Sequence, residues 1–200
     1  MSSREEILGR LQIAAKELRN QGASLMKEPV LPDFNKEYLG NKVAKFMELI
    51  DILHGQAMEV DSLTEVKQYI DKKYPGQRVF INIEDAEYNN PEEWQNSDPH
   101  DLEDIEFALF QGTLAVAENG AIWFTEEQMG QRVAPYICQQ MGVLIKKETI
   151  HHTMAEAYEI LKDPTLGFGG FIAGPSKTAD IEQSLVTGAH GPRGLVVFIL

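Results

Sequence analysis

The residue types best suited to chemistry are concentrated near the C-terminus, in the run Gly174-Pro175-Ser176-Lys177-Thr178. An apolar segment before this run predicts a strand, and the segment after it is expected to form a helix through about Val186. A loop that leads from a strand into a helix leaves backbone N–H groups free, and the helix dipole favours a negative charge there. Lys177 and the hydroxyls of Ser176 and Thr178 add donors. The loop is therefore a candidate site for a carboxylate or a phosphate.

The same loop also has a purely structural interpretation. Gly174-Pro175 suits a tight turn, and a hydroxyl can cap the helix that follows. Asp180 and Glu182 would then be acidic residues in the first turn, where they complement the helix dipole. On these residues alone the choice between capping and anion binding stays open.

A second cluster, Gly188 to Gly194, precedes the last apolar run of the chain. It places an imidazole, His190, and a guanidinium, Arg193, in a glycine-rich connection. His190 could act as an acid or base near neutral pH, and Arg193 could bind an anion with two hydrogen bonds. A histidine in a turn is more often a structural hydrogen-bonding residue, so both roles for His190 stay open.

Glu118 is the carboxylate best placed for catalysis, because it would close a buried strand beside the turn dipeptide Asn119-Gly120. Burial at such a position raises the basicity of a carboxylate and suits it to act as a base or nucleophile. The alternative is a plain polar residue next to a hairpin turn. Positive charge in the same region comes from Arg132, His151, His152 and the Lys146-Lys147 pair, and solvation at the surface explains these residues equally well.

Composition excludes several classes of function. A net charge of −13 disfavours duplex nucleic acid and anionic membranes as partners, since both would be repelled. No stretch approaches the roughly 20 apolar residues of a membrane span, which favours the cytoplasm. The single cysteine, Cys138, excludes an internal disulfide and an iron-sulfur cluster held by about four cysteines of this chain. The scattered histidines show no zinc-ligand spacing, so no metal site is predicted.

The first third of the chain, residues 1–75, is predicted to be helical. Ser3 and Glu6, and again Ser62 and Glu65, have the spacing of a capping box at the start of an amphipathic segment. Apolar residues then recur at helical spacing in three segments, 7–18, 39–53 and 63–70. With 200 residues and 43% apolar composition, one domain over 1–200 is expected.

The rest of the chain alternates strands and helices, which predicts an α/β fold with a largely parallel or mixed sheet and helices on both faces. Asn119-Gly120 favours a type I′ hairpin turn, and the Thr153–Glu156 spacing predicts a helix that ends before Pro164. The acidic segment 84–104 is expected to be a flexible insertion or a lid, or to contain short helices. Strands are predicted at 79–83, 107–110, 114–117, 121–124, 133–138, 141–145, 170–173 and 195–200.

Three blocks in the C-terminal half resemble the LUD domain of the lactate utilization protein C (LutC) family. They are Ala117-Glu118-Asn119-Gly120-Ala121 with Gln131-Arg132 downstream, Gly174 to Glu182, and Gly188 to Arg193 before an apolar strand. The resemblance covers residues 104–200, and the helical N-terminal part agrees in general layout. Asn119 and Ala121 depart from the family's pattern, which has threonine at both positions.

The resemblance implies a NagB/RpiA/CoA-transferase-like fold and a role in oxidation of L-lactate to pyruvate, with iron-sulfur clusters only on partner proteins. It also favours one site, with Glu118 and His190 as catalytic residues. Class I CoA-transferases carry their acyl-accepting glutamate in a Glu-Asn-Gly motif, as at Glu118-Asn119-Gly120. The residues expected to bind a small anionic substrate are Gly174, Ser176, Lys177, Thr178, Asp180, Gly191, Arg193 and Arg132.

Three functional hypotheses follow. The first is a LutC-like component of cytoplasmic lactate oxidation. The second is a stand-alone enzyme that acts on a small anionic metabolite, with Glu118 as base or acyl acceptor. The third is a non-catalytic assembly or regulatory subunit whose motifs shape the fold and an interface. Convergence of Glu118, Lys177, His190 and Arg193 on one cleft would imply a functional site.

Overall fold

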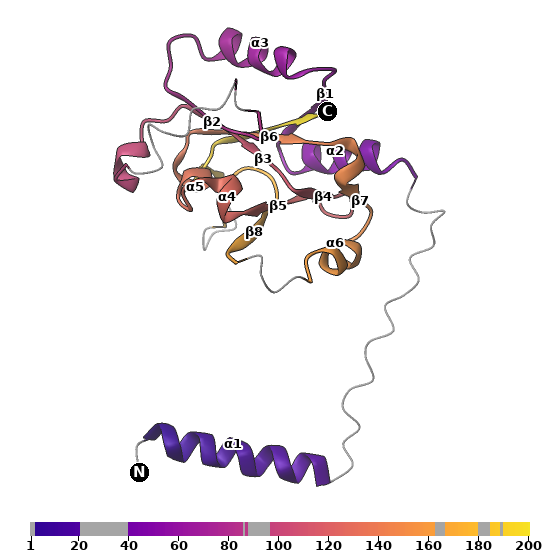
Figure 1. Ribbon diagram of the computed structural model, residues 1–200, viewed down its shortest axis with the longest axis vertical. Coiled ribbons are helices and arrows are strands. Elements are labelled where there is room, and N and C mark those ends of the chain that lie inside the picture. Colours follow the sequence, from indigo (N-terminus) through magenta and orange to yellow (C-terminus); the bar gives the residue numbers. More distant parts are fainter. Residues whose placement is uncertain are drawn as a thin grey trace. The chain divides into compact units, whose positions relative to one another are not determined.

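The computed structural model describes residues 3–20, 40–85, 87, 97–162, 167–179, 185–188 and 190–200. Two compact units are present, Met1–Tyr38 and Leu39–Leu200, and each is described by itself. The first unit contains the predicted N-terminal helix, α1 (Ser3–Asn20), on which Ile7 and Leu11 are exposed. The second unit contains all the strands and the remaining helices of the described chain (Figure 1).

A five-stranded sheet forms the centre of the second unit. Its order is β1-β11-β6-β3-β2, and all four pairings are parallel. The C-terminal strand lies inside this sheet and is buried on both faces, as its continuous apolar run predicts. The strands are β1 (Gln56–Glu59), β2 (Val79–Asn82), β3 (Phe107–Gln111), β6 (Gln140–Ile145) and β11 (Gly194–Ile199).

Helices cover both faces of this sheet, which confirms the predicted α/β class. Helix α3 (Leu63–Lys73) packs Val66 and Ile70 on one face, and Tyr74 at its C-terminus stacks on Phe107 with ring centroids 4.6 Å apart. Helix α2 (Lys42–Ile52) buries its apolar side on the opposite face. The predicted box at the start of α3 is absent, because Ser62 is the N-cap but its side chain makes no capping hydrogen bond.

A second, four-stranded sheet packs on the same side as α2 and has the order β7-β4-β5-β8. It is mixed, since β4 pairs with β7 in parallel and with β5 antiparallel. The aromatic rings of Phe110 and Phe124 meet between the two sheets, with centroids 6.5 Å apart. The strands are β4 (Leu114–Val116), β5 (Ala121–Thr125), β7 (Ile150–His151) and β8 (Gly169–Ile172).

The β4–β5 hairpin is where the sequence predicts it, but its turn differs. A four-residue loop, 117–120, joins the strands, and the Gly120 N–H donates to the Val116 carbonyl at 2.9 Å. Gly120 has a positive φ of 71°, whereas Asn119 does not, and a type I′ turn requires both. The predicted turn type is therefore wrong. The Asn119 side chain accepts a hydrogen bond from the Ala121 N–H in the observed loop.

Short helices complete the fold. Helix α6 (Met154–Ile160) covers the outer face of the second sheet and, as predicted, Thr153 accepts from the Glu156 N–H. Helix α4 (Glu126–Met129) has a complete capping box at Thr125. The described chain also contains the 3₁₀ helices η3 (Pro99–Leu102) and η4 (Lys147–Thr149).

Three further sequence predictions are wrong. Residues 133–138 contain a short helix, α5 (Ala134–Ile137), because Pro135 suits a first helical turn and a short buried apolar run does not distinguish helix from strand. The predicted helical segment 1–75 includes the edge strand β1, whose four residues have no strong apolar pattern. The helix expected after Lys177 is an antiparallel hairpin of β9 (Lys177–Ala179) and β10 (Leu185–Thr187).

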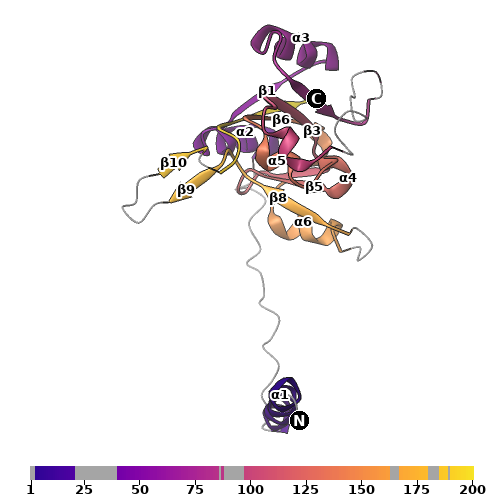
Figure 2. The same cartoon turned by 90° about the vertical axis from the view of Figure 1, so that its left-hand side faces the viewer.

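Figure 2 shows this β9–β10 hairpin projecting from the body formed by the two larger sheets. Its pairing is Lys177 with Thr187 and Ala179 with Leu185. Part of the acidic segment 84–104 lies outside the described residues, and η3 is a short helix within it. No helix in the described ranges is long and apolar enough to cross a membrane.

Candidate functional site

A cavity of about 300 Å³ lies where the loop 174–177 meets the loop 190–192. Five of the predicted site residues line it: Gly174, Ser176, Lys177, His190 and Gly191. The structure therefore brings together two of the three sequence blocks. The remaining walls come from α5, the end of β8 and the first residues of β6 and β11.

Main-chain hydrogen bonds hold the two loops together. The Ser176 N–H donates to the Pro192 carbonyl at 2.9 Å, and the Gly188 N–H donates to the Ser176 carbonyl at 3.0 Å. The loops approach so closely that a Cβ on Gly191 would lie 3.0 Å from Ser176 Cβ. Glycine at 191 thus permits the contact that sets the Ser176 side chain against the second loop.

The loop 174–177 does not bind an anion in the way that the sequence predicts. A strand, β9, follows it in place of a helix, so this loop does not lie at the N-terminus of a helix. The Ser176 N–H is already used in the bond to Pro192. The Ser176 hydroxyl and the Lys177 ammonium are side-chain donors at the cavity.

Lys177 places its ammonium group over the loop. Gly174 has a positive φ of 73°, and a Cβ there would lie 3.5 Å from Lys177 Nζ and 3.1 Å from the Leu53 carbonyl oxygen. Leu53 ends α2, so this loop is seated against the C-terminus of that helix. Among the described residues, no carboxylate forms an ion pair with Lys177.

The charge of the cavity is opposite to that of the chain as a whole. Its lining includes Lys177 and His190 but no aspartate or glutamate among the described residues. The chain has 31 acidic residues and a net charge of −13, so a surface chosen at random would include carboxylates. This local composition favours an anionic ligand.

The cavity lies at the N-terminal edge of the parallel sheet. Met141 and Leu195 on its floor are the second residues of β6 and β11. Ligands of open α/β sheets usually bind beyond the carboxyl ends of the strands. The geometry therefore differs from that common arrangement, because here loops that precede the strands build the walls.

Glu118 is not among the residues that line the cavity. Its side chain is exposed, and Oε2 accepts a hydrogen bond of 2.8 Å from the Met154 N–H at the start of α6. The burial expected of a catalytic carboxylate is absent. In this structure Glu118 caps a helix, and Asn119 beside it is also exposed.

The two predicted arginines also lie outside the cavity lining. Arg132 pairs with Glu126, with Nε 2.7 Å from Oε1 and Nη2 3.1 Å from Oε2, and lies over the Phe168 ring. This contact raises the pKa of Arg132 and lowers the pKa of Glu126. Arg193 packs along Gly188, where a Cβ would lie 2.5 Å from Arg193 Cγ.

Asp180 lies outside the described residues, and Thr178 is described only as part of β9.

One cavity residue, Tyr136, carried no signal that could have identified it. Tyr136 lines the cavity and is 47% exposed, but it belongs to the apolar run for which a strand is predicted. His54 follows Leu53 and is the only non-glycine residue of the described chain with a positive φ, 65°. Such backbone conformations are uncommon outside glycine, and this one lies next to the residue that contacts Gly174.

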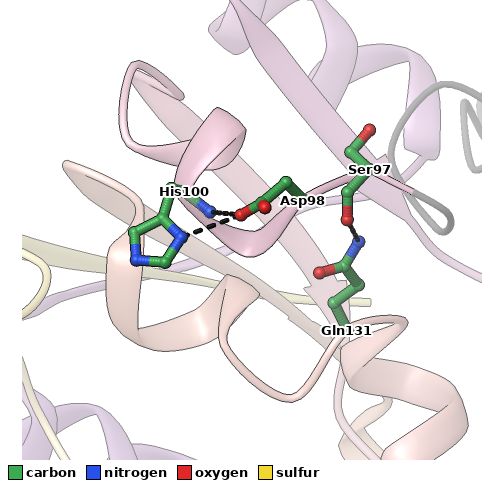
Figure 3. Close-up of polar contacts among 4 residues, drawn as sticks. All are labelled: Ser97, Asp98, His100 and Gln131. Atoms are coloured by element: carbon green, nitrogen blue, oxygen red, sulfur yellow. Dashed lines mark hydrogen bonds and ion pairs between the residues drawn. The ribbon is translucent and has the colours of Figure 1, made fainter.

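A second polar cluster lies at the start of η3 (Figure 3). Asp98 Oδ1 accepts from the His100 N–H and is 2.8 Å from His100 Nδ1, and Gln131 donates to the Ser97 carbonyl. The hydrogen bond with Asp98 raises the pKa of His100, and the bonds from His100 lower the pKa of Asp98. Since His100 is 94% exposed, this cluster is a capped turn at the surface and offers no enclosed site.

Burial also shifts the pKa values of two other side chains, Cys138 and His151. Cys138 is buried, and desolvation raises the pKa of its thiol to about 12, so the thiolate is scarce at neutral pH. The pKa of His151 is lowered by desolvation and by the nearby charge of Lys42. Among the described residues no group of three or more His, Cys, Asp and Glu side chains is arranged to hold a metal ion.

Comparison with known proteins places residues 96–200 in the LUD domain family. The chain is 30% identical over 104 residues to lactate utilization protein C of Bacillus pumilus, which covers 49% of this chain and 43% of that protein. It is 34% identical over 80 residues to the protein of the same name from Anoxybacillus flavithermus, covering 40% and 36%. The match to that of Geobacillus kaustophilus is 28% over 127 residues, covering 60% and 50%.

The chain therefore matches half or less of the length of these curated relatives. A crystal structure of a DUF162 family protein from Deinococcus radiodurans has the same fold, with a TM-score of 0.62 at 18% identity, over 79% of this chain and 95% of that one. The resemblance inferred from the three sequence blocks is confirmed. Because the family match spans the whole C-terminal part, including both loops of the cavity, the chain belongs to the LUD domain family.

Proposed function

We propose that this chain is a component of L-lactate utilization and that its cavity binds a small anionic ligand. The observation that carries the proposal is the meeting of two family blocks, Gly174 to Lys177 and His190 to Pro192, around one cavity whose described lining contains no carboxylate. Relatives that share this region are named lactate utilization protein C. The cytoplasmic location predicted from the sequence belongs to the same proposal.

Each polar group in the cavity has a role in this proposal. Lys177 neutralises the carboxylate of the ligand, and the Ser176 hydroxyl donates a hydrogen bond to it. His190 is the group at the cavity that can accept or donate a proton near neutral pH. These residues bind and orient a hydroxy acid or oxo acid.

The oxidation of lactate to pyruvate removes two electrons and two protons from the substrate. The electrons require an acceptor, and we assign that role to iron-sulfur partner proteins, since this chain has a single, buried cysteine. The chain would then contribute ligand binding or assembly to a system of several proteins. The proposal includes these partners and leaves the chain's own catalytic role to experiment.

Complementation of a deletion strain tests the role. In a lactate-using host that lacks the gene, the wild-type chain should restore growth on lactate and lactate consumption, and Lys177→Met should restore little of either. Lys45→Met is the matched control, because Lys45 is exposed on α2 and pairs with Glu48 at 3.0 Å, away from the cavity. Unchanged growth of the deletion strain on lactate would overturn the proposal.

Binding and assembly are separated by a second measurement. Pull-down of the partner proteins by wild type and by Lys177→Met, together with calorimetric titration of lactate and pyruvate, distinguishes a ligand-binding component from an assembly subunit. Retained partner capture with lost anion binding supports the cavity as the functional site. Full growth of cells that carry Lys177→Met would show that the function does not require anion binding at this site.

A further inference from the structure

We infer that the cavity takes a carboxylate with an apolar body longer than the methyl group of lactate. The inference rests on the proposed anion site and adds the chemical class of its ligand. Two observations carry it: the size of the cavity and a lining that contains both polar and apolar side chains.

The cavity is too large for lactate alone. A three-carbon hydroxy acid occupies the volume of about three water molecules, or roughly 90 Å³ at about 30 Å³ per water. The cavity measures about 300 Å³. A bound lactate would leave most of the space to water, and water against apolar walls contributes little to affinity.

The lining contains both polar and apolar side chains. A hydroxyl, an ammonium group and an imidazole come from the two loops, at Ser176, Lys177 and His190. Strands and α5 contribute the apolar side chains Met141, Leu195, Ile172 and Pro135, and α5 also contributes Tyr136. A ligand that satisfies both kinds of side chain has an anionic end and a hydrocarbon body.

Two apolar residues of the lining belong to the core of the protein. Met141 is 1% exposed and Leu195 is 2% exposed, and both belong to the main hydrophobic core. Atoms of a ligand placed against these two residues leave water without exposing any polar group of the protein. Each added methylene should therefore increase affinity until the body fills the cavity.

A homologous series of straight-chain 2-hydroxy acids, from lactate to 2-hydroxyoctanoate, tests the inference by calorimetry on the purified full-length chain. Affinity should rise by roughly two- to fourfold for each methylene and level off when the chain outgrows the cavity. A flat or falling series overturns the inference, and so does a protein that binds no member. Growth complementation by wild type is independent of this result, so the proposed lactate role can stand if the series fails.

Variants locate the effect. Ala173 is exposed and lines the cavity, so Ala173→Phe should fill part of its volume and weaken the long acids more than the short ones. Ala155→Phe, on the exposed side of α6, is the matched control and should leave the series unchanged. Lys177→Met should weaken all members by a similar factor. An equal loss across the series with Ala173→Phe would show that the apolar body binds elsewhere and would overturn the inference.

Discussion

The Ser176 N–H donates a hydrogen bond to the carbonyl oxygen of Pro192 at 2.9 Å, and this bond joins two loops that the β9–β10 hairpin separates in the sequence. With the returning bond from Gly188 to Ser176, the hairpin begins and ends at the cavity. The position of Lys177, the first residue of β9, is therefore coupled to the second loop. The conformation of the cavity depends on both loops together.

Gly174 should be essential to this conformation. Its positive φ of 73° and a Cβ contact of 3.1 Å with the Leu53 carbonyl oxygen predict that Gly174→Ala lowers the free energy of unfolding by about 1–3 kcal/mol. Denaturant unfolding followed by circular dichroism measures the loss. Gly170→Ala is the control, because nothing lies within 4 Å of a Cβ there and φ is not positive. Equal stability of the two variants would contradict the assigned strain.

Glu118 should act on stability and not on chemistry. Its carboxylate caps α6 through the Met154 N–H, so Glu118→Ala should lower the free energy of unfolding by about 0.5–1 kcal/mol. Glu118→Gln keeps an acceptor oxygen and should retain both stability and growth on lactate. Loss of growth with Glu118→Gln at unchanged stability, or a hydroxylamine-trapped acyl adduct on Glu118, would instead support the CoA-transferase hypothesis.

The pKa values of His100 and His151 should depart from the ordinary histidine value in opposite directions. The hydrogen bond to Asp98 raises the pKa of His100, while desolvation and then Lys42 lower the pKa of His151. NMR titration of the imidazole signals should therefore show His151 losing its proton at lower pH than His100. Asp98→Asn should lower the pKa of His100 alone, and Lys42→Gln should raise the pKa of His151 alone. The reverse order of the two titrations would contradict the packing around both residues.

The same shifts give the sign of the pH dependence of stability. His100 binds its proton more tightly in the folded state, so its contribution is complete below its unfolded pKa and is lost as pH rises through the folded value. His151 binds its proton less tightly in the folded state, so its contribution is present above the unfolded pKa and is lost as pH falls through the folded value. Unfolding curves of Asp98→Asn and Lys42→Gln at several pH values measure the two effects.

Cys138 should be inert in the folded protein. The side chain is 1% exposed and burial raises the pKa of the thiol to about 12, so a thiol reagent such as dithionitrobenzoate should react only on unfolding. Release of one thiol equivalent in guanidinium but none under native conditions is the expected result. Rapid reaction of the native protein would show that the core around α5 opens readily.

Much of the fold could be predicted from local patterns. The continuous apolar run at 195–200 indicates a strand buried on both faces, and β11 occupies that position. Asn119-Gly120 marks the hairpin, and Thr153 with Glu156 marks the start of α6. These features depend on a residue's neighbours in the chain, so the sequence contains the necessary information. The family blocks likewise predict the LUD domain family, and the family match over residues 96–200 confirms it.

The hairpin after Lys177 shows where local patterns fail. Asp180 and Glu182 favour a helix start, but the flanking residues Thr178, Val186 and Thr187 are β-branched and suit a strand. Antiparallel pairing of residues 177–179 with residues 185–187 makes this segment a hairpin and not a helix. The paired residues are too far apart in the sequence for a pattern of helical spacing to relate them. Because no helix follows the loop, the prediction that a helix dipole favours an anion there does not apply.

The sequence by itself determined the apolar strands, the family and the two loops from which the cavity is built. Tertiary structure alone decided which residues meet: Lys177 and His190 line one cavity, Glu118 caps α6, and Arg132 pairs with Glu126. The physical reason is that side-chain type and spacing fix local conformation, whereas the partner of a charged side chain depends on the packing of segments distant in the chain.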